Sequence, residues 1–413
     1  MADSYLIGIN GLFLDHPRTG TGVYTREVLA RLAQTSPATP PRDGALRYVV
    51  VGHPEHAAAF AAAVPYVRLQ APLRRHTTNG EKVLWEQLAL PLATARLGID
   101  LLYAPYFSLP LVAGVRTVVT VHDLIPLLLP EYAPSVGLKA YFRLVSAATR
   151  DADAVVTDSY CSAGDIARLL GVPPERIHVV YLGVDPRYSV VPPVPPERLQ
   201  ALCARLGLPE RFILYMGGID PRKNVGVLLR AQRGVRDRGL RALPLVIVAP
   251  HGRLPARWER GDPRTEAARL AVESDVLFLD QIPDADKPAL YAAATAFAWP
   301  SRYEGFGLPP LEAMASGTPV LCSTSSSLPE VTGDAALGLN PDDVDAWVEG
   351  FVRIAQDEPL RARLAAQGRL RAAAFTWDRT VLGLRQVFRQ VLAASPRHRS
   401  RRDSADRIPC ASS

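Results

Sequence analysis

Short apolar runs alternate with longer helical patterns through most of this sequence. Six runs fall in the first half and six in the second: YLIGIN, YVVVG, LLYAP, TVVTVHD, AVVTDS and HVVYLG, then FILYMGG, PLVIVA, VLFLD, AFAWPS, PVLCS and ALGLN. Continuous apolar strands separated by helices form parallel sheets that are covered on both faces. The pattern therefore predicts an α/β fold with two doubly wound, Rossmann-like domains that face each other across a cleft.

A proline-dense segment, VVPPVPPERLQ, separates the two halves. This proline density excludes a central strand and indicates a semi-rigid linker. We expect a first domain over residues 1–190, a linker over 191–210, a second domain over 211–375, a closing amphipathic helix over 376–394 and a disordered basic tail over 395–413. A length of 413 residues agrees with two domains.

Charge and cysteine content argue against several classes of protein. About half of the net charge of +6 lies in the Arg-rich tail, so no nucleic-acid partner is expected. The four cysteines lack metal-binding spacing, which indicates free thiols in a cytoplasmic protein. The N-terminal apolar run is short and broken, so it predicts a strand rather than a signal peptide. No apolar run reaches about 18 residues, which leaves only peripheral contact at the inner face of a membrane.

The block SRYEGFGLPPLEAMASG places two carboxylates around a glycine turn, after the predicted strand AFAWPS. Its double proline suits the first turn of a helix. The backbone N–H groups of Phe306, Gly307 and Leu308 then lie at a helix N-terminus, which favours an anion such as phosphate. Because Glu304 and Glu312 would repel phosphate, we expect them to bind sugar hydroxyls on either side of it. A sugar nucleotide has this order of groups, although Glu312 could instead complement the helix dipole.

A second loop carries two cations at the start of the second domain. In FILYMGGIDPRKN, Arg222 and Lys223 precede a helix whose expected N-cap is Asn224. Cations oppose the dipole at a helix N-terminus. A bound diphosphate would remove that conflict, and a pair of solvated surface charges is the alternative.

Three candidate features lie in the first half. His122, at the end of the predicted strand TVVTVHD, is either a catalytic or sugar-binding group at the cleft or a structural histidine. Gly20 and Gly22 in RTGTGVYT form a weak phosphate-loop pattern, for which a flexible turn is the alternative. The segment 74–96, with Trp85 and several leucines, lies near an acceptor or a membrane surface or else forms an ordinary amphipathic helix.

Together these residues resemble the family 4 retaining glycosyltransferases, which have the two-domain GT-B fold. The matching segments are EGFGLPPLEAMASGTPV, SSSLPEVTGDAA, GGIDPRKN, HDLIP, DSYCSAGDI, YLGVDP and FTWDRT, together with the Gly20-Thr-Gly22 turn. They span nearly the whole chain except its tail. The two glutamates with the downstream SLPEV are specific, whereas HDLIP alone is not. HDLIP and GGIDPRKN look most like the mannosyltransferase branch, which implies GDP-mannose as the donor.

The resemblance implies roles for the matching residues of the second domain. Glu304 would contact the transferred sugar, and the backbone of residues 306–308 would hold the sugar and the diphosphate. Glu312 would bind the ribose hydroxyls, and Lys223 would bind the diphosphate.

In the first domain, His122 would lie beside the sugar, and Gly20 and Gly22 would let their loop approach the phosphates. One departure from the family is Gly218, where relatives often have arginine. Arg222 is the residue that can replace this charge.

The function predicted from the sequence is transfer of a hexose from a nucleoside diphosphate sugar to a glycan, a lipid-linked glycan or another hydroxyl acceptor. No cofactor is expected, and the absence of an Asp-x-Asp motif predicts a metal-independent reaction. A catalytically silent sugar-nucleotide-binding partner subunit is the alternative. A sugar-nucleotide epimerase or a phosphorylase is a third interpretation, which the two-glutamate block disfavours.

Overall fold

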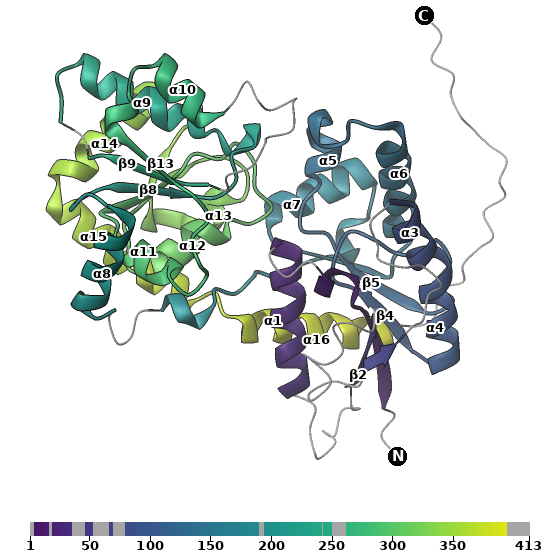
Figure 1. Cartoon of the computed structure of the whole chain (residues 1–413). Helices are drawn as coiled ribbons and strands as arrows, with labels where there is room; N and C mark the ends of the chain where they lie inside the picture. The colour runs from purple at the N-terminus through teal and green to yellow at the C-terminus, as the bar shows by residue number, and fades with distance from the viewer. Residues whose placement is uncertain are drawn as a thin grey trace, which may run out of the picture.

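The computed structural model describes residues 4–15, 19–34, 46–52, 66–68, 79–189, 194–241, 243–249 and 262–394. They form two α/β domains, each built on one parallel sheet (Figure 1). No helix among these residues is long and apolar enough to cross a bilayer. The basic tail expected over 395–413 lies outside the described residues.

The first sheet has the strand order β3-β2-β1-β4-β5-β6-β7. Its strands are β1 (Tyr5–Asn10), β2 (Leu46–Gly52), β3 (Tyr66–Arg68), β4 (Leu101–Ala104), β5 (Arg116–Thr120), β6 (Ala154–Thr157) and β7 (Ile177–Val179). All neighbours pair in parallel, and the order reverses between β1 and β4, as in a doubly wound fold. The sequence predicted six strands, and the seventh is β3, a three-residue strand at the edge of the sheet.

Helices and single helical turns connect these strands: η1 (Leu12–Asp15), α1 (Gly20–Gln34), α3 (Asn79–Leu84), η3 (Trp85–Ala89), α4 (Leu90–Leu97), α5 (Ile125–Leu128), η4 (Pro130–Tyr132), α6 (Val136–Arg150), α7 (Tyr160–Asp165), η5 (Ile166–Leu170), η6 (Pro174–Arg176) and η7 (Pro186–Tyr188). In α1, Tyr24, Val28 and Leu32 follow each other at four-residue spacing, and all three are buried. One face of α1 is thus fixed to the core, as this spacing predicts.

The second sheet has the order β10-β9-β8-β11-β12-β13, which repeats the winding of the first. Its strands are β8 (Ile213–Met216), β9 (Leu245–Val248), β10 (Val276–Leu279), β11 (Ala296–Trp299), β12 (Val320–Ser323) and β13 (Leu337–Leu339). Again all neighbours are parallel. The winding reverses between β8 and β11, so ligands are expected beyond the carboxyl ends of these two strands.

The helical elements of the second half are α8 (Pro196–Leu206), η8 (Pro221–Lys223), α9 (Val225–Asp237), α10 (Pro263–Arg269), η10 (Glu273–Asp275), α11 (Lys287–Ala293), α12 (Leu308–Ala315), α13 (Leu328–Thr332), η11 (Gly333–Ala335), α14 (Val344–Gln356), α15 (Glu358–Ala373) and α16 (Trp377–Ala393). Helix α8 lies inside the segment 191–210, which the sequence suggested was a semi-rigid linker. Proline starts this helix at its first turn instead of preventing it.

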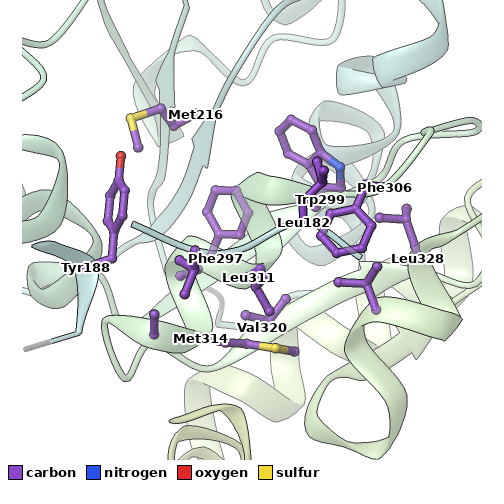
Figure 2. Packing of buried hydrophobic residues seen from close by; sticks show 14 of the residues in the cluster. Leu182, Tyr188, Met216, Phe297, Trp299, Phe306, Leu311, Met314, Val320 and Leu328 are labelled. Atoms are coloured by element: carbon purple, nitrogen blue, oxygen red, sulfur yellow. The ribbon is translucent and has the colours of Figure 1, made fainter. Parts of the chain in front are cut away.

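Two crossings of the chain join the domains. The segment that follows β7 runs to the second domain, where Leu182 and Tyr188 share one hydrophobic cluster with Phe297, Trp299 and Phe306 (Figure 2). Helix α16 returns to the first domain and packs against α1 (Figure 1). These crossings hold the carboxyl ends of the two sheets near each other.

Candidate functional site

Four loops at strand ends supply the polar residues of the candidate site. In the second domain, Arg222 and Lys223 follow β8, and Glu304 follows the neighbouring strand β11. In the first domain, His122 follows β5 and Asp158 follows β6. Parallel neighbours end at the same edge of a sheet, so the topology alone brings each set together.

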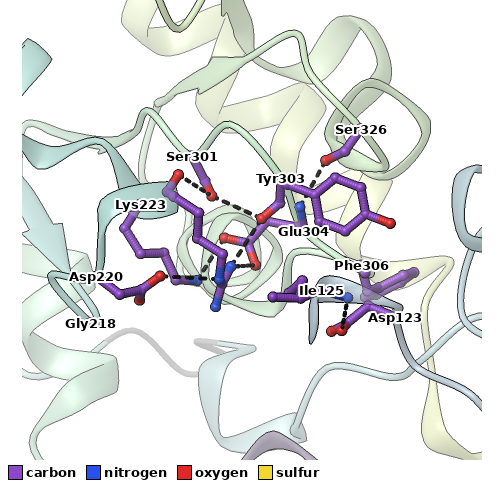
Figure 3. Close-up of polar contacts among 12 residues, drawn as sticks. Asp123, Ile125, Gly218, Asp220, Lys223, Ser301, Tyr303, Glu304, Phe306 and Ser326 are labelled. Carbon is purple, nitrogen blue, oxygen red and sulfur yellow. Dashed lines mark hydrogen bonds and ion pairs between the residues drawn. The ribbon is translucent and has the colours of Figure 1, made fainter. Parts of the chain in front are cut away.

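Glu304 is the centre of an ion cluster in the second domain (Figure 3). Its Oε1 accepts a hydrogen bond from Lys223 Nζ at 2.6 Å, and its Oε2 accepts one from Arg222 Nη1 at 2.9 Å. Arg222 also pairs with Asp220 at 3.2 Å, and Lys223 Nζ lies 4.4 Å from the ring centroid of Trp299. The site therefore holds two cations and a carboxylate that pairs with both.

Burial and charge act in opposite directions on the Glu304 carboxyl. Burial alone would raise its pKa, but the charges of Lys223 and Arg222 prevail and hold the pKa below its usual value. Burial lowers the pKa of Lys223, against the attraction of Glu304. We infer that Glu304 stays ionised at neutral pH because both of its oxygens face cations.

This cluster changes two expectations from the sequence. The two cations before α9 are paired without a ligand, because both contact Glu304 and Arg222 also contacts Asp220. Asn224 occupies the N-cap position of α9, but its side chain makes no cap hydrogen bond. It instead donates to the carbonyls of Pro300 at 3.3 Å and Pro341 at 2.6 Å, which connects the start of α9 to the loops that follow β11 and β13.

Glu312 lies in a different environment, on helix α12. Because the helix begins at Leu308, Glu312 is in the second turn, and the first turn carries no acidic residue. The helix dipole acts mainly within the first turn, so this position weakens the dipole alternative. Glu312 Oε2 accepts a hydrogen bond from the Tyr291 hydroxyl at 3.0 Å. Burial raises the pKa of Glu312 to about 7, although the Tyr291 hydrogen bond opposes it.

Each residue of the Gly-Phe-Gly turn between the two acids has a structural role. A Cβ on Gly305 would lie 2.4 Å from the carbonyl oxygen of His122, so glycine permits the two domains to touch here. Gly307 has φ of +120°, which side chains rarely adopt. The Phe306 ring packs against Tyr181 and Phe375, with centroids 6.0 and 5.8 Å away. The backbone N–H groups of residues 306–308 precede the first hydrogen-bonded turn of α12, so the helix itself gives them no acceptor.

His122 forms a dyad with Asp158, a residue to which the sequence assigned no role. Its Nδ1 lies 2.7 Å from Asp158 Oδ2, and the Tyr24 ring packs edge-on against the imidazole at 4.7 Å. His122 Nε2 and Asp158 Oδ1 are buried without a hydrogen-bond partner in the described part of the chain. Burial would lower the pKa of His122, but the Asp158 carboxylate raises it above its usual value. Asp158 belongs to the segment DSYCSAGDI at the end of a predicted strand, and this position could have identified it as a site residue.

Hydrogen bonds between the domains surround this dyad. Ser159 Oγ donates to the Gly305 carbonyl at 2.7 Å, and the Tyr303 hydroxyl donates to Asp165 at 2.6 Å. At the N-terminus of α7, the backbone N–H of Tyr160 donates to the Glu330 carboxylate at 2.8 Å. Glu330 belongs to the SLPEV segment, so this motif connects the domains.

Gly20 and Gly22 occupy the first turn of α1, where Thr19 Oγ1 accepts a hydrogen bond from Gly22 N at 3.0 Å. Tyr24, two residues further along, touches His122 and so places this helix end beside the dyad. A Cβ on Gly20 would meet no atom of the described residues within 4 Å. Within the described ranges, no group of three or more His, Cys, Asp or Glu side chains is placed to hold a metal ion.

Known proteins match both domains. Residues 19–188 match the model of the family "Glycosyltransferase Family 4", and residues 205–371 match "Glycosyl transferases group 1". The O-antigen chain mannosyltransferase B of Escherichia coli is 32% identical over 378 residues, which are 88% of this chain and 94% of that protein. A D-inositol 3-phosphate glycosyltransferase of Salinispora arenicola is 38% identical over 251 residues, 59% of this chain and 56% of that protein.

The fold also matches solved structures. The Anabaena protein HepE in complex with UDP has a TM-score of 0.69 and 18% identity, and the match covers 94% of this chain and 100% of that one. The mannosyltransferase relative aligns over nearly its whole length, and both domains match glycosyltransferase models. The chain therefore belongs to the family 4 glycosyltransferases, enzymes with the two-domain GT-B fold.

Proposed function

We propose that this enzyme transfers a hexose from a nucleoside diphosphate sugar with retention of the anomeric configuration, and that GDP-mannose is its donor. The observation that carries the proposal is Glu304, which is ionised between Lys223 and Arg222 beyond the carboxyl ends of β8 and β11. The mannosyltransferase relative supports the choice of sugar. Donors with other nucleotides or hexoses are the competing outcomes.

In this proposal the second domain binds the donor. Lys223 and Arg222 bind the diphosphate, assisted by the backbone N–H groups of residues 306–308 at the start of α12. Glu304 accepts hydrogen bonds from hydroxyls of the sugar, because a carboxylate oxygen that faces a cation keeps a further lone pair. Glu312, beside Tyr291, accepts hydrogen bonds from the ribose hydroxyls.

The reaction breaks the bond between the anomeric carbon and the diphosphate oxygen and forms a bond to the acceptor oxygen. The proton of the acceptor hydroxyl leaves with the nucleoside diphosphate. Negative charge grows on the diphosphate, and the two cations stabilise it where it develops. These cations support a metal-independent reaction. In this proposal Glu304 orients the sugar hydroxyls and is not the nucleophile, because its pairing with Lys223 and Arg222 lowers the basicity of the carboxylate.

His122 meets the donor from the first domain. Its backbone touches Gly305, and Asp158 fixes its ring through Nδ1, so a sugar hydroxyl would have to reach Nε2, which is buried near the Pro105 backbone.

Gly20 and Gly22 lie at the start of α1. Gly20 is exposed, so a phosphate can approach its backbone, whereas Gly22 is buried and its N–H donates to Thr19 Oγ1. The acceptor, a glycan or a lipid-linked glycan, binds on the first-domain side at the cytoplasmic face of a membrane.

The test is thermal unfolding with GDP, UDP, dTDP and ADP and their common sugar conjugates. A ligand present at 100 times its dissociation constant adds roughly 2.7 kcal/mol to the free energy of unfolding. We expect GDP and GDP-mannose to stabilise the protein most. A larger shift with another nucleotide refutes the donor but not the family.

The second candidate, a silent binding protein, predicts the same shifts and no chemistry. Slow hydrolysis of the donor without acceptor, with the released sugar in the α configuration by NMR, supports the transferase. Tight donor binding with neither hydrolysis nor transfer supports the binding protein. Activity that disappears in a chelator and returns with a divalent ion contradicts metal independence.

A further inference from the structure

Asp123 is a carboxyl group at the cleft that has no role in the proposed reaction. It directly follows His122 after β5 in the first domain, and it is half-buried. Its Oδ1 accepts a hydrogen bond from the backbone N–H of Ile125 at 3.0 Å. This bond closes the turn before α5, which is a common use of aspartate in turns. A purely structural role for Asp123 needs only this one oxygen.

The second oxygen of Asp123, Oδ2, is available to a ligand. Among the residues that the structure describes, none forms a hydrogen bond or an ion pair with it. It is also not one of the buried polar atoms that lack a partner, so solvent or a ligand can reach it. An ionised carboxylate oxygen can only accept hydrogen bonds, so the ligand group that it fits is a donor such as a hydroxyl.

The side chain of Asp123 lies against the loop of the second domain that carries Glu304. A Cβ added to Gly305 would lie 3.0 Å from the Cβ of Asp123, so the two segments touch at this point. Arg222 and Glu304 are near enough to the Asp123 carboxyl to act on it electrostatically. Figure 3 shows Asp123 beside the residues around Glu304. Asp123 therefore faces the donor site from the first domain.

The charge of Asp123 is unfavourable if the site holds only a diphosphate. Burial raises the pKa of this carboxyl and Glu304 adds to the effect, whereas Arg222 and His122 oppose it. Arg222 already pairs with Glu304 and with Asp220. A further carboxylate beside this cation repels a diphosphate and weakens its binding. A hydrogen bond from an uncharged part of the donor offsets this repulsion, and the sugar hydroxyls are the uncharged donor groups next to the diphosphate.

We propose that Oδ2 of Asp123 accepts a hydrogen bond from a hydroxyl of the transferred sugar. The sugar then lies between Asp123 of the first domain and Glu304 of the second, and both domains recognise it. The inference rests on the proposed function, because it requires a nucleoside diphosphate sugar as the donor. It does not depend on which nucleotide or hexose the donor contains.

The test is calorimetric titration with GDP and GDP-mannose, at pH 8, above the pKa of about 7 at Glu312. The ratio of the two dissociation constants measures what the sugar contributes to binding. Asp123→Ser keeps a hydroxyl that can close the turn but withdraws the second oxygen. The contribution of the sugar should fall by about tenfold, the effect of one hydrogen bond to a charged group. Asp123→Asn keeps both positions without the charge and should show a smaller loss.

A matched control replaces an aspartate that closes a helix start far from the donor site. Asp357 accepts a hydrogen bond from the N–H of Leu360 at 2.8 Å at the start of α15. It lies at the edge where β8 begins, because Arg211, just before that strand, contacts Ala355. Serine can replace aspartate as a cap, so Asp357→Ser should keep the wild-type ratio of the two dissociation constants.

Free GDP separates a lost sugar contact from a damaged site. Both Asp123 variants should bind GDP at least as tightly as the wild type, because a negative charge near the diphosphate is removed. A damaged site would lose affinity for GDP and GDP-mannose alike.

Two results would overturn the inference. The first is a wild-type ratio of dissociation constants in both Asp123 variants. The second is an equal change of affinity for the two ligands, which would show that Asp123 acts on the diphosphate and not on the sugar. If another nucleotide stabilises the wild type most, that nucleotide and its sugar conjugate replace GDP and GDP-mannose in the same test. A wild type that no nucleotide stabilises overturns the proposed function, and this inference with it.

Discussion

Glu304 lies in the loop before helix α12 and Glu312 lies in the second turn of that helix, yet their surroundings are opposite in kind. Glu304 faces two cations, whereas Glu312 faces a tyrosine hydroxyl. Both are buried enough for burial to raise their pKa values, but the outcome differs: the pKa of Glu304 is lowered and that of Glu312 rises to about 7. One acid is charged before any ligand arrives, and the other gains its full charge only with a ligand or at higher pH.

Removing the charge of Glu304 should have the largest effect. Glu304→Gln should lower kcat by roughly 10²–10³-fold, the usual effect of losing one charge-stabilising group at a reacting centre. It also leaves Lys223 buried without its partner, which costs about 3–5 kcal/mol of stability. The double variant with Lys223→Met should regain stability without regaining activity. Full activity in either variant would remove Glu304 from the reaction.

The contact between the domains supplies the second test. In Gly305→Ala the new Cβ would lie 2.4 Å from the His122 carbonyl oxygen, so the two domains must separate at this point. We expect kcat to fall by about 10²-fold, since small misplacements of catalytic groups have effects of this size. GDP affinity should change less than kcat, because Lys223, Arg222 and Glu312, which hold GDP in the proposal, all belong to the second domain. Unchanged turnover would show that the contact is not needed.

The third test concerns Glu312 and pH. If the ionised carboxylate binds the ribose, donor affinity should rise with pH through about 7 and level off above it, as the carboxyl loses its proton. Glu312→Gln should weaken donor binding by about tenfold, the effect of one hydrogen bond to a charged group. It should also flatten this pH dependence. Titration calorimetry at pH 6, 7 and 8 measures both effects.

The fourth test separates the His122 dyad from the acids. In Asp158→Asn the His122 pKa should fall, because the carboxylate that raises it is gone. NMR titration of the imidazole reports this shift directly, and kcat should fall about tenfold as the ring loses its fixed orientation. A His122 pKa that does not move would contradict the pairing.

The fifth test concerns the free energy of unfolding. The folded pKa of Glu312 is about 7 against an ordinary 4.5, so the folded state holds this proton more tightly than the unfolded chain does. The stability contributed by the proton is present below about 4.5 and is lost as the pH rises through 7, by at most about 3 kcal/mol. Glu312→Gln should therefore raise Tm at pH 8 and have little effect at pH 4. No difference between the two pH values would contradict the raised pKa.

Much of this picture could be predicted from local patterns. Twelve of the strands are visible in the sequence as apolar runs. The order of the strands in the second sheet then brings Glu304 and Lys223 together. Two elements were not predicted from the sequence. Strand β3 has only three residues, and helix α8 begins in a proline-rich stretch. The unpredicted contacts are those between distant segments. Asp158 pairs with His122, and Glu330 reaches α7 across the domain boundary.

The most direct test of the division between the two acids is calorimetric titration of GDP and GDP-mannose into the wild type, Glu304→Gln and Glu312→Gln. GDP lacks the sugar, so Glu304→Gln should bind GDP at least as tightly as the wild type, because Lys223 and Arg222 are then released from Glu304. Glu312→Gln should weaken GDP and GDP-mannose equally. Equal losses of affinity for both ligands in both variants would contradict the account, since Glu304 and Glu312 would then have the same role.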